Sequence, residues 1–149
     1  MKKRSTNVLN LLVALVLVSF VGSALHAEDK LAEKPASKGV EKITIEQFEE
    51  KAKEKDVVIL DVRSAEEFKE GHVPGATNVN VSDEKFAEKV EALGKDKSIL
   101  VYCRSGKRST AATDRMSKMG FEKLYNFVGS MNEWTAAKKP VEKGDGAKK

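Results

Sequence analysis

Two short runs of consecutive apolar residues constrain the fold of this 149-residue chain more than any other feature. Residues 57–60 read VVIL and residues 99–101 read ILV. Strands that are buried on both faces need apolar side chains at nearly every position, so such runs are typical of inner strands in a parallel sheet. Parallel strands also need long crossover connections, which are usually helices. The two runs therefore predict an α/β fold with a mostly parallel sheet.

Helix signals alternate with these strand signals along the chain. Residues 44–47 and 64–67 have the capping-box pattern, in which a hydroxyl side chain and a Gln or Glu side chain each satisfy a free backbone N–H. Apolar stripes at helical spacing predict three further helices, one capped by Ser82 and ended by Gly94, one over 109–119 and one over 131–137. Additional strands are expected at 77–81 and 124–125, with a turn at 71–75.

The first 27 residues have the layout of a secretory signal peptide. A basic start at 2–4 is followed by an apolar stretch over 8–21, and small residues precede Glu28. The stretch is short for a spanning helix, which needs about 20 apolar residues. We expect cleavage after Ala27 and an exported protein without a stable membrane span, periplasmic in a host with an outer membrane. The alternative is an uncleaved segment that anchors the protein to the membrane.

Composition divides the rest of the chain into three parts. Residues 28–40 mix Lys, Glu, Pro, Ser and Gly without apolar periodicity, so a flexible linker is expected there. Residues 139–149 are rich in Lys and Gly, which predicts a disordered tail. The α/β domain is expected over 41–138, a usual size for one domain.

Charge and cysteine content exclude several classes of function. The net charge is +4, but without the three basic residues at 2–4 the balance is 24 basic against 23 acidic residues. A nucleic-acid-binding domain would carry a dense basic face, so no nucleic-acid partner is expected. One cysteine excludes an internal disulfide. The chain has only two histidines, widely separated in the sequence, so a structural zinc site is disfavoured as well. We expect no metal and no cofactor.

The single cysteine, Cys103, stands where an α/β sheet binds ligands. It directly follows the strand expected at 98–102, and a helix follows the loop 103–108, which reads CRSGKR. Backbone N–H groups ahead of a helix can form an anion-binding nest, and Gly106 allows the backbone conformation that a nest requires. The loop also carries three cations: Arg104, Lys107 and Arg108. Positive charge and a helix N-terminus favour thiolate over thiol, so Cys103 is a candidate nucleophile; the alternative is a small buried hydrophobe.

These residues resemble the active-site loop of the rhodanese family of sulfurtransferases. Upstream, residues 60–63 (LDVR), 67–68 (EF) and 71–76 (GHVPGA), followed by Asn78, resemble the second signature of that family, in the expected order. The match runs from about Ile43 to Trp134. The resemblance implies a rhodanese-like domain, with a central parallel sheet of about five strands flanked by helices. It also implies a cysteine persulfide: a small anionic donor such as thiosulfate gives sulfur to Cys103, and cyanide or a thiol removes it.

The resemblance assigns roles residue by residue. Cys103 is the sulfur-carrying nucleophile, and the substrate cradle consists of Arg104, Ser105, Gly106, Lys107, Arg108 and Ser109. Arg108 occupies the last loop position, which varies in the family and is thought to tune the substrate. The upstream signature contributes Asp61, Arg63 and His72, mostly in structural roles. We expect His72 to be a hydrogen-bonded turn residue rather than a general base, and Asp61 and Arg63 to be either an ion pair supporting the site or plain surface.

Two other functions stay open at this point. Cysteine phosphatases and arsenate reductases of related fold have an arginine six positions after the cysteine, where this chain has Ser109. The loop is therefore one residue short for that chemistry. A non-catalytic rhodanese-like module that binds a partner commonly lacks the cysteine, which this chain retains. A thiol redox protein is disfavoured because there is no Cys-x-x-Cys and no resolving cysteine.

Overall fold

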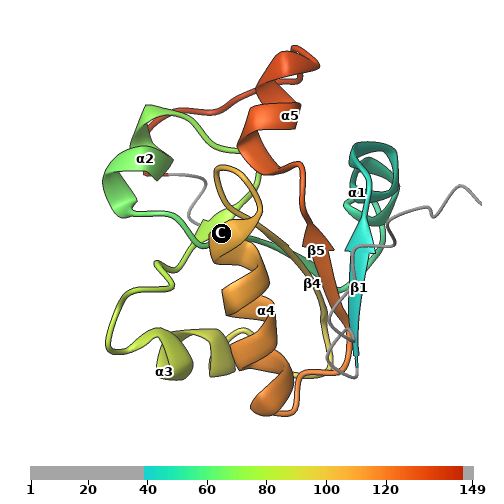
Figure 1. Ribbon diagram of the computed structural model, residues 1–149, viewed down its shortest axis with the longest axis vertical. Coiled ribbons are helices and arrows are strands. Elements are labelled where there is room, and N and C mark those ends of the chain that lie inside the picture. Colours follow the sequence, from blue (N-terminus) through green and yellow to red (C-terminus); the bar gives the residue numbers. More distant parts are fainter. Residues whose placement is uncertain (1–38, 146–149) are drawn as a thin grey trace, which may run out of the picture. The chain divides into compact units, whose positions relative to one another are not determined.

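A computed structural model describes residues 39–145 of the chain (Figure 1). The expected signal peptide and nearly all of the expected linker lie outside these residues. Within them, strands and helices alternate as the apolar runs indicated. No helix in this part of the chain is long and apolar enough to cross a membrane.

The centre of the domain is a five-stranded sheet in which every strand pair is parallel. The strand order is β1-β5-β4-β2-β3, which places the two apolar runs side by side in the middle. The strands are β1 (Val40–Ile43), β2 (Val57–Asp61), β3 (Thr77–Asn78), β4 (Ser98–Tyr102) and β5 (Leu124–Phe127). The helices are α1 (Ile45–Lys51), α2 (Ala65–Glu70), α3 (Phe86–Glu91), α4 (Lys107–Lys118) and α5 (Ser130–Ala136). The α/β prediction is confirmed.

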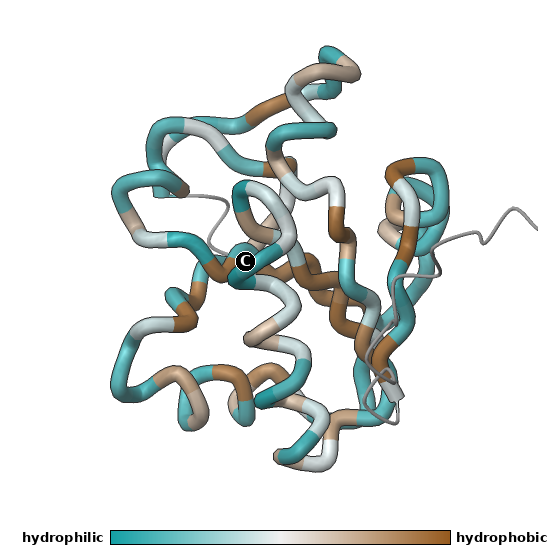
Figure 2. The backbone as a smooth tube through the Cα atoms, viewed as in Figure 1, coloured by the Kyte–Doolittle hydropathy of each residue, from teal (hydrophilic) through white to brown (hydrophobic). Residues whose placement is uncertain are grey.

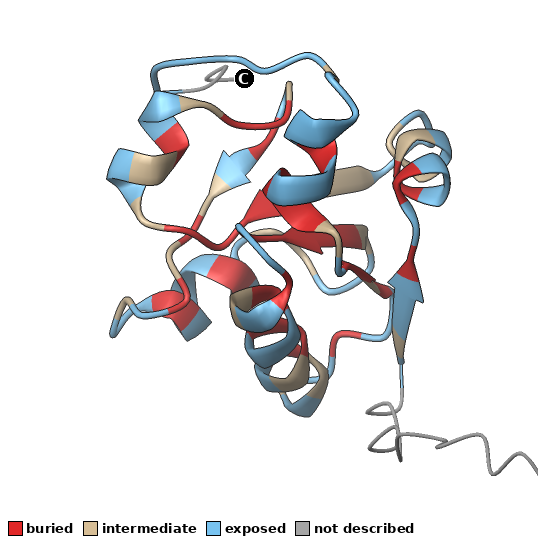
Figure 3. Cartoon of the chain, turned by 45° about the horizontal axis from the view of Figure 1, so that its top comes forward, coloured by how far each residue is buried: buried red, intermediate tan, exposed pale blue. Residues whose placement is uncertain are grey.

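Side chains of β4 belong to two separate hydrophobic clusters, one on each face of the sheet. Ile99 and Val101 pack on one face with residues of α3 and α4. Leu100 and Tyr102 pack on the opposite face with residues of α1, α2 and α5. This alternation is the period of two that a strand imposes, and it explains why the whole run is apolar. Figure 2 shows the hydrophobic residues gathered along the central strands, and Figure 3 shows the same strands buried.

Both predicted capping boxes are present and start their helices as expected. The Thr44 side chain accepts from the N–H of Gln47 while the Gln47 side chain accepts from the N–H of Thr44. Ser64 and Glu67 form the same reciprocal pair at α2. The second box matters for function because it fixes Glu67 close to the loop that carries Cys103.

The segment between β3 and α3 differs from the prediction. The strand expected over 77–81 pairs with β2 only at Thr77 and Asn78. Ser82 does not cap α3, which begins at Phe86 without a side-chain cap. The reason is local: the side chains of Asn80 and Asp83 accept from backbone N–H groups two residues further on, which turns the chain before a helix can start.

Three boundaries also differ from the prediction. The edge strand β1 was not predicted, because only its first and last residues are apolar, and its presence ends the expected linker at Gly39. Helix α4 begins at Lys107, two residues before Ser109, because the loop closes tightly at Gly106. The expected tail is ordered over 139–145, where Pro140 accepts from the indole N–H of Trp134 and Glu142 exchanges backbone hydrogen bonds with His72. Backbone groups rather than apolar side chains hold the segment 139–145 in place, so the hydropathy pattern could not predict that it is ordered.

Candidate active site

Cys103 lies where β4 ends, with its side chain on the face that α4 covers. The residue is only 1% exposed and belongs to the apolar cluster of that face. Its backbone carbonyl accepts from the N–H of Met131, and the carbonyl of Arg104 accepts from the N–H of Asn132. The start of α5 therefore holds the entrance of the loop in place.

Gly106 turns the loop so that its backbone N–H faces the sulfur. The N–H of Gly106 donates to Cys103 Sγ over 3.1 Å. The residue has a positive φ of 88°, and a Cβ atom built on it would stand 2.4 Å from the carbonyl oxygen of Val128. Only glycine fits this conformation and this space. The loop thus presents a backbone N–H to the cysteine sulfur.

Two serine hydroxyls lie against the sulfur from different elements. Ser109 of α4 and Ser130 of α5 each place Oγ 3.8 Å from Cys103 Sγ. The Ser130 Oγ also accepts from the backbone N–H of Cys103 and donates to the carbonyl of Phe127. Ser109 was predicted as part of the cradle. Ser130 was not, because no local pattern indicates that the end of β5 returns to the cysteine.

This surrounding shifts the acidity of the thiol. Burial of the sulfur raises the pKa of Cys103, and this is the largest single effect. The backbone N–H groups at Ser109 and Ser105 oppose it, together with the hydroxyls of Ser109 and Ser130. These donors stabilise the thiolate by more than burial destabilises it, so the pKa of Cys103 lies below its ordinary value. The thiolate is the nucleophilic form, so the site favours the reactive species.

The cations of the loop are not equivalent. Arg104 and Lys107 are exposed. Arg108 instead makes a bidentate ion pair with Glu67 of α2, with Nη1 and Nη2 at 2.6 and 2.8 Å from the two carboxylate oxygens. The hydrogen bonds from Arg108 hold the pKa of Glu67 down at about 2, so this carboxyl is ionised at any working pH. Arg108, which the sequence places in the substrate cradle, is thus paired with a carboxylate of the protein itself.

Asp61 and Arg63 form a buried ion pair beside the end of β4. The guanidinium of Arg63 contacts both carboxylate oxygens, at 2.6 Å in the shortest contact, and the two side chains are 0% and 7% exposed. Arg63 also donates to the carbonyl of Gly71. The side chain of Asn78 donates to the backbone carbonyls of Asp61 and Arg63. Of the two roles considered, the structure has the ion pair and not plain surface. It braces the turn that carries the second signature.

His72 is completely buried in the same turn. Its ring stacks on Phe68 with a centroid distance of 3.7 Å, and Nδ1 donates to the carbonyl of Phe68 over 2.8 Å. Nε2 lies 3.7 Å from a carboxylate oxygen of Glu142 and makes no hydrogen bond. These contacts are those of a hydrogen-bonded turn residue.

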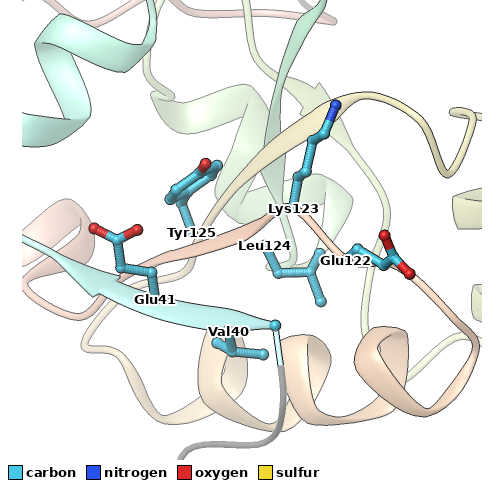
Figure 4. A pocket seen from close by; sticks show the side chains of 7 residues that line it. Val40, Glu41, Glu122, Lys123, Leu124 and Tyr125 are labelled. Atoms are coloured by element: carbon cyan, nitrogen blue, oxygen red, sulfur yellow. The ribbon is translucent and has the colours of Figure 1, made fainter.

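The larger hollows of the domain lie away from Cys103. Figure 4 shows one of about 270 Å³ where β1 and β5 begin, at the opposite edge of the sheet from the end of β4. Another, of about 1010 Å³, runs beside β2 and β3, and no residue of the loop 103–106 lines it. Among residues 39–145, no cluster of three His, Cys, Asp or Glu side chains could hold a metal ion.

Comparison with known proteins agrees with this geometry. The family model described as Rhodanese-like domain matches residues 44–137, and the chain belongs to this family. Thiosulfate sulfurtransferase GlpE of Coxiella burnetii is 32% identical over 87 residues, which cover 58% of this chain and 79% of that protein. A mitochondrial protein of Schizosaccharomyces pombe, provisionally named a thiosulfate sulfurtransferase, is 37% identical over 94 residues, 55% of this chain and 66% of its own length. The chain thus spans somewhat less than two thirds of that relative.

Solved structures share the fold. A rhodanese-related protein of Thermoplasma volcanium has a TM-score of 0.60 at 28% identity, covering 68% of this chain and 97% of that one. A Rhodopseudomonas palustris protein, described as of unknown function and a possible tyrosine phosphatase, has a TM-score of 0.58 at 27% identity, covering 72% and 88%. The sequence and the fold thus both place the chain in the rhodanese-like family.

Proposed function

We propose that this protein is a sulfurtransferase that carries sulfane sulfur as a persulfide on Cys103. The contact that carries the proposal is the 3.1 Å hydrogen bond from the Gly106 N–H to the cysteine sulfur. A backbone donor aimed at a buried sulfur stabilises negative charge there, both on the thiolate and on the sulfur that it receives. Relatives named for thiosulfate sulfurtransferase activity support the same reaction class.

The reaction has two steps that balance in atoms and charge. In the first, the Cys103 thiolate attacks the outer sulfur of thiosulfate, a new S–S bond forms, and sulfite leaves with the electron pair of the broken S–S bond. In the second, cyanide or a thiolate attacks the outer sulfur of the persulfide and releases the Cys103 thiolate. The products are thiocyanate or a small-molecule persulfide. Neither step needs an external oxidant or reductant.

The site supports sulfur transfer over phosphoryl transfer. The sixth position after the cysteine, which holds an arginine in cysteine phosphatases, holds the buried hydroxyl of Ser109, and that hydroxyl donates to the carbonyl of Gly106. A phosphoryl group would bring several oxygens into a space whose donors already face one sulfur. Each oxygen left without a partner would cost about 1–3 kcal/mol.

Steady-state assays of the purified protein test this proposal. We expect thiocyanate to form from thiosulfate and cyanide, no meaningful hydrolysis of an aryl phosphate, and neither activity in Cys103→Ser. Circular dichroism of the variant serves as the control for folding. Efficient aryl phosphate hydrolysis that depends on Cys103 would contradict the proposal and favour the phosphatase. Absence of both activities in the wild type would favour a binding module.

A further inference from the structure

The ion pair between Glu67 and Arg108 lies at the rim of the candidate active site. The two side chains are 28% and 34% exposed, so solvent reaches the pair. The carboxylate comes from α2 and the guanidinium from the start of α4, 41 positions further along the chain. The pKa of Arg108 is raised first by its hydrogen bonds to Glu67, and the Cys103 thiolate also contributes. Arg108 directly precedes Ser109, whose hydroxyl lies 3.8 Å from the sulfur, so the guanidinium belongs to the immediate surroundings of the loop.

The Glu67 carboxylate is held in this place by a second contact. As the third residue of the α2 capping box, its Oε2 accepts from the backbone N–H of Ser64 over 3.3 Å. The carboxylate is therefore held both by the Arg108 guanidinium and by the Ser64 N–H, which keeps it in place when an anion approaches. Its negative charge is thus a permanent part of the rim.

Arg108 therefore adds little net positive charge at the mouth of the site. The other nearby acid–base pair, Asp61 and Arg63, is neutral as a unit. The uncompensated charge of the loop comes from Arg104 and Lys107, which are both exposed and screened by water. An anionic donor meets a weaker positive field than the loop sequence suggests.

We propose that Glu67 sets the charge preference of this site, disfavouring dianionic sulfur donors such as thiosulfate relative to donors with one negative charge. The inference rests on the proposed function, because it concerns the donor for the persulfide on Cys103. Glu67 then cancels the charge of Arg108, and Arg108 does not bind the donor.

Two donors separate charge from shape. Thiosulfate carries two negative charges, and methanethiosulfonate, with a methyl group in place of one oxygen, carries one. Each gives its outer sulfur to the Cys103 thiolate, and the leaving group is sulfite or methanesulfinate. Removing one negative charge a few ångströms from the bound donor, across water, should increase the affinity for a singly charged donor about threefold. A donor with two negative charges gains this factor twice, which is about tenfold.

The decisive variant is Glu67→Gln, which removes the charge and keeps the capping box. The box at α1 already uses a glutamine at the same position, Gln47, so the substitution preserves local structure. The matched control is Glu66→Gln, which removes the same charge from the same turn of α2, where the side chain is exposed and does not pair with Arg108. We expect Glu67→Gln to lower the KM for thiosulfate about tenfold and that for methanethiosulfonate about threefold, with kcat within twofold. Glu66→Gln should change both KM values by less than twofold.

A double variant separates charge compensation from donor binding by Arg108. Arg108→Gln alone should raise the thiosulfate KM, since Glu67 is then unopposed. Glu67→Gln combined with Arg108→Gln restores the wild-type net charge and should restore the wild-type ratio of the two KM values. A higher thiosulfate KM in Glu67→Gln, equal shifts for the two donors, or a double variant that behaves like Arg108→Gln would overturn the proposal.

Alkylation of Cys103 tests the field even if sulfur transfer fails. The ratio of the rates with iodoacetate, an anion, and iodoacetamide, a neutral reagent, should rise about threefold in Glu67→Gln and stay unchanged in Glu66→Gln. A shifted ratio in a protein that transfers no sulfur would reject the proposed function and keep the role of Glu67. An unshifted ratio in a protein that transfers sulfur would keep the proposed function and reject the role of Glu67.

Discussion

The hydroxyl of Ser130 accepts a hydrogen bond from the backbone N–H of Cys103 over 3.1 Å and lies 3.8 Å from its sulfur, although the two residues are 27 positions apart. Ser130 is fully buried and has a positive φ of 53°, which is uncommon for a residue other than glycine. Strained backbone that persists beside a reactive group is typical of functional sites. The contact joins the start of α5 to Cys103 at the end of β4.

Removing this hydroxyl is expected to change the acidity of the thiol. In the wild type, the pKa of Cys103 lies below its ordinary value, so the midpoint of the rate of alkylation by iodoacetamide against pH should lie below that of a free cysteine. Ser130→Ala and Ser130→Gly both lose the hydroxyl that lowers the pKa of Cys103, so the midpoint of the pH profile should move up in both. Because glycine accepts a positive φ, Ser130→Gly should also be the more stable of the two by about 1 kcal/mol. Unchanged midpoints in both variants would leave Ser130 with a structural role only.

Gly106→Ala is expected to disrupt the loop. Its Cβ would stand 2.4 Å from the carbonyl oxygen of Val128, and its φ of 88° is strained for alanine. The matched control is Gly120→Ala, where φ is 91° but nothing lies within 4 Å of the added atom. Both variants carry the cost of the positive φ, roughly 1 kcal/mol. Only Gly106→Ala should lose more than that in thermal unfolding and abolish sulfur transfer; equal losses in both would show that the loop can adjust.

The buried pair of Asp61 and Arg63 is expected to dominate local stability. Asp61→Ala leaves a buried guanidinium without its carboxylate, which typically costs about 3–5 kcal/mol. The exposed pair of Glu91 and Lys95 provides the comparison, since both side chains are about half exposed. Glu91→Ala should cost less than about 1 kcal/mol in urea unfolding. Similar losses for the two substitutions would show that the Asp61 pair is not braced as the structure indicates.

Export is a separate proposal that rests on the sequence alone. The signal-peptide layout of the first 27 residues, outside the described part of the chain, predicts a mature protein that begins near Glu28. N-terminal sequencing of the protein from its native host measures this directly. A chain that keeps Met1 and sediments with membranes would support an uncleaved anchor instead.

The fold was predictable where patterns are local. Two apolar runs and two capping boxes predicted the central strands and two of the helices, because burial and capping each require particular residue types at particular positions. The edge strand β1 and the segment 139–145 show neither pattern, because backbone hydrogen bonds hold them and only the first and last residues of β1 are apolar.

The site was predictable only in part, for the same reason. The loop from Cys103 to Ser109 is contiguous, so its cradle could be inferred from the sequence. The contacts of Ser130 and Glu67 with that loop depend on tertiary structure, and no spacing rule indicates them. Arg108 could be placed in the cradle from the sequence, but its pairing with the Glu67 carboxylate of α2 could not.

The mass of the intact protein after treatment with thiosulfate tests the central proposal most directly. Cys103 is the only thiol in the chain, so a covalently bound sulfur atom can be assigned to it without ambiguity. We predict that the mass rises by one sulfur atom, that cyanide returns it to the starting value with release of thiocyanate, and that Cys103→Ser shows neither change. A wild-type mass that stays constant while thiocyanate still forms would contradict a persulfide on Cys103.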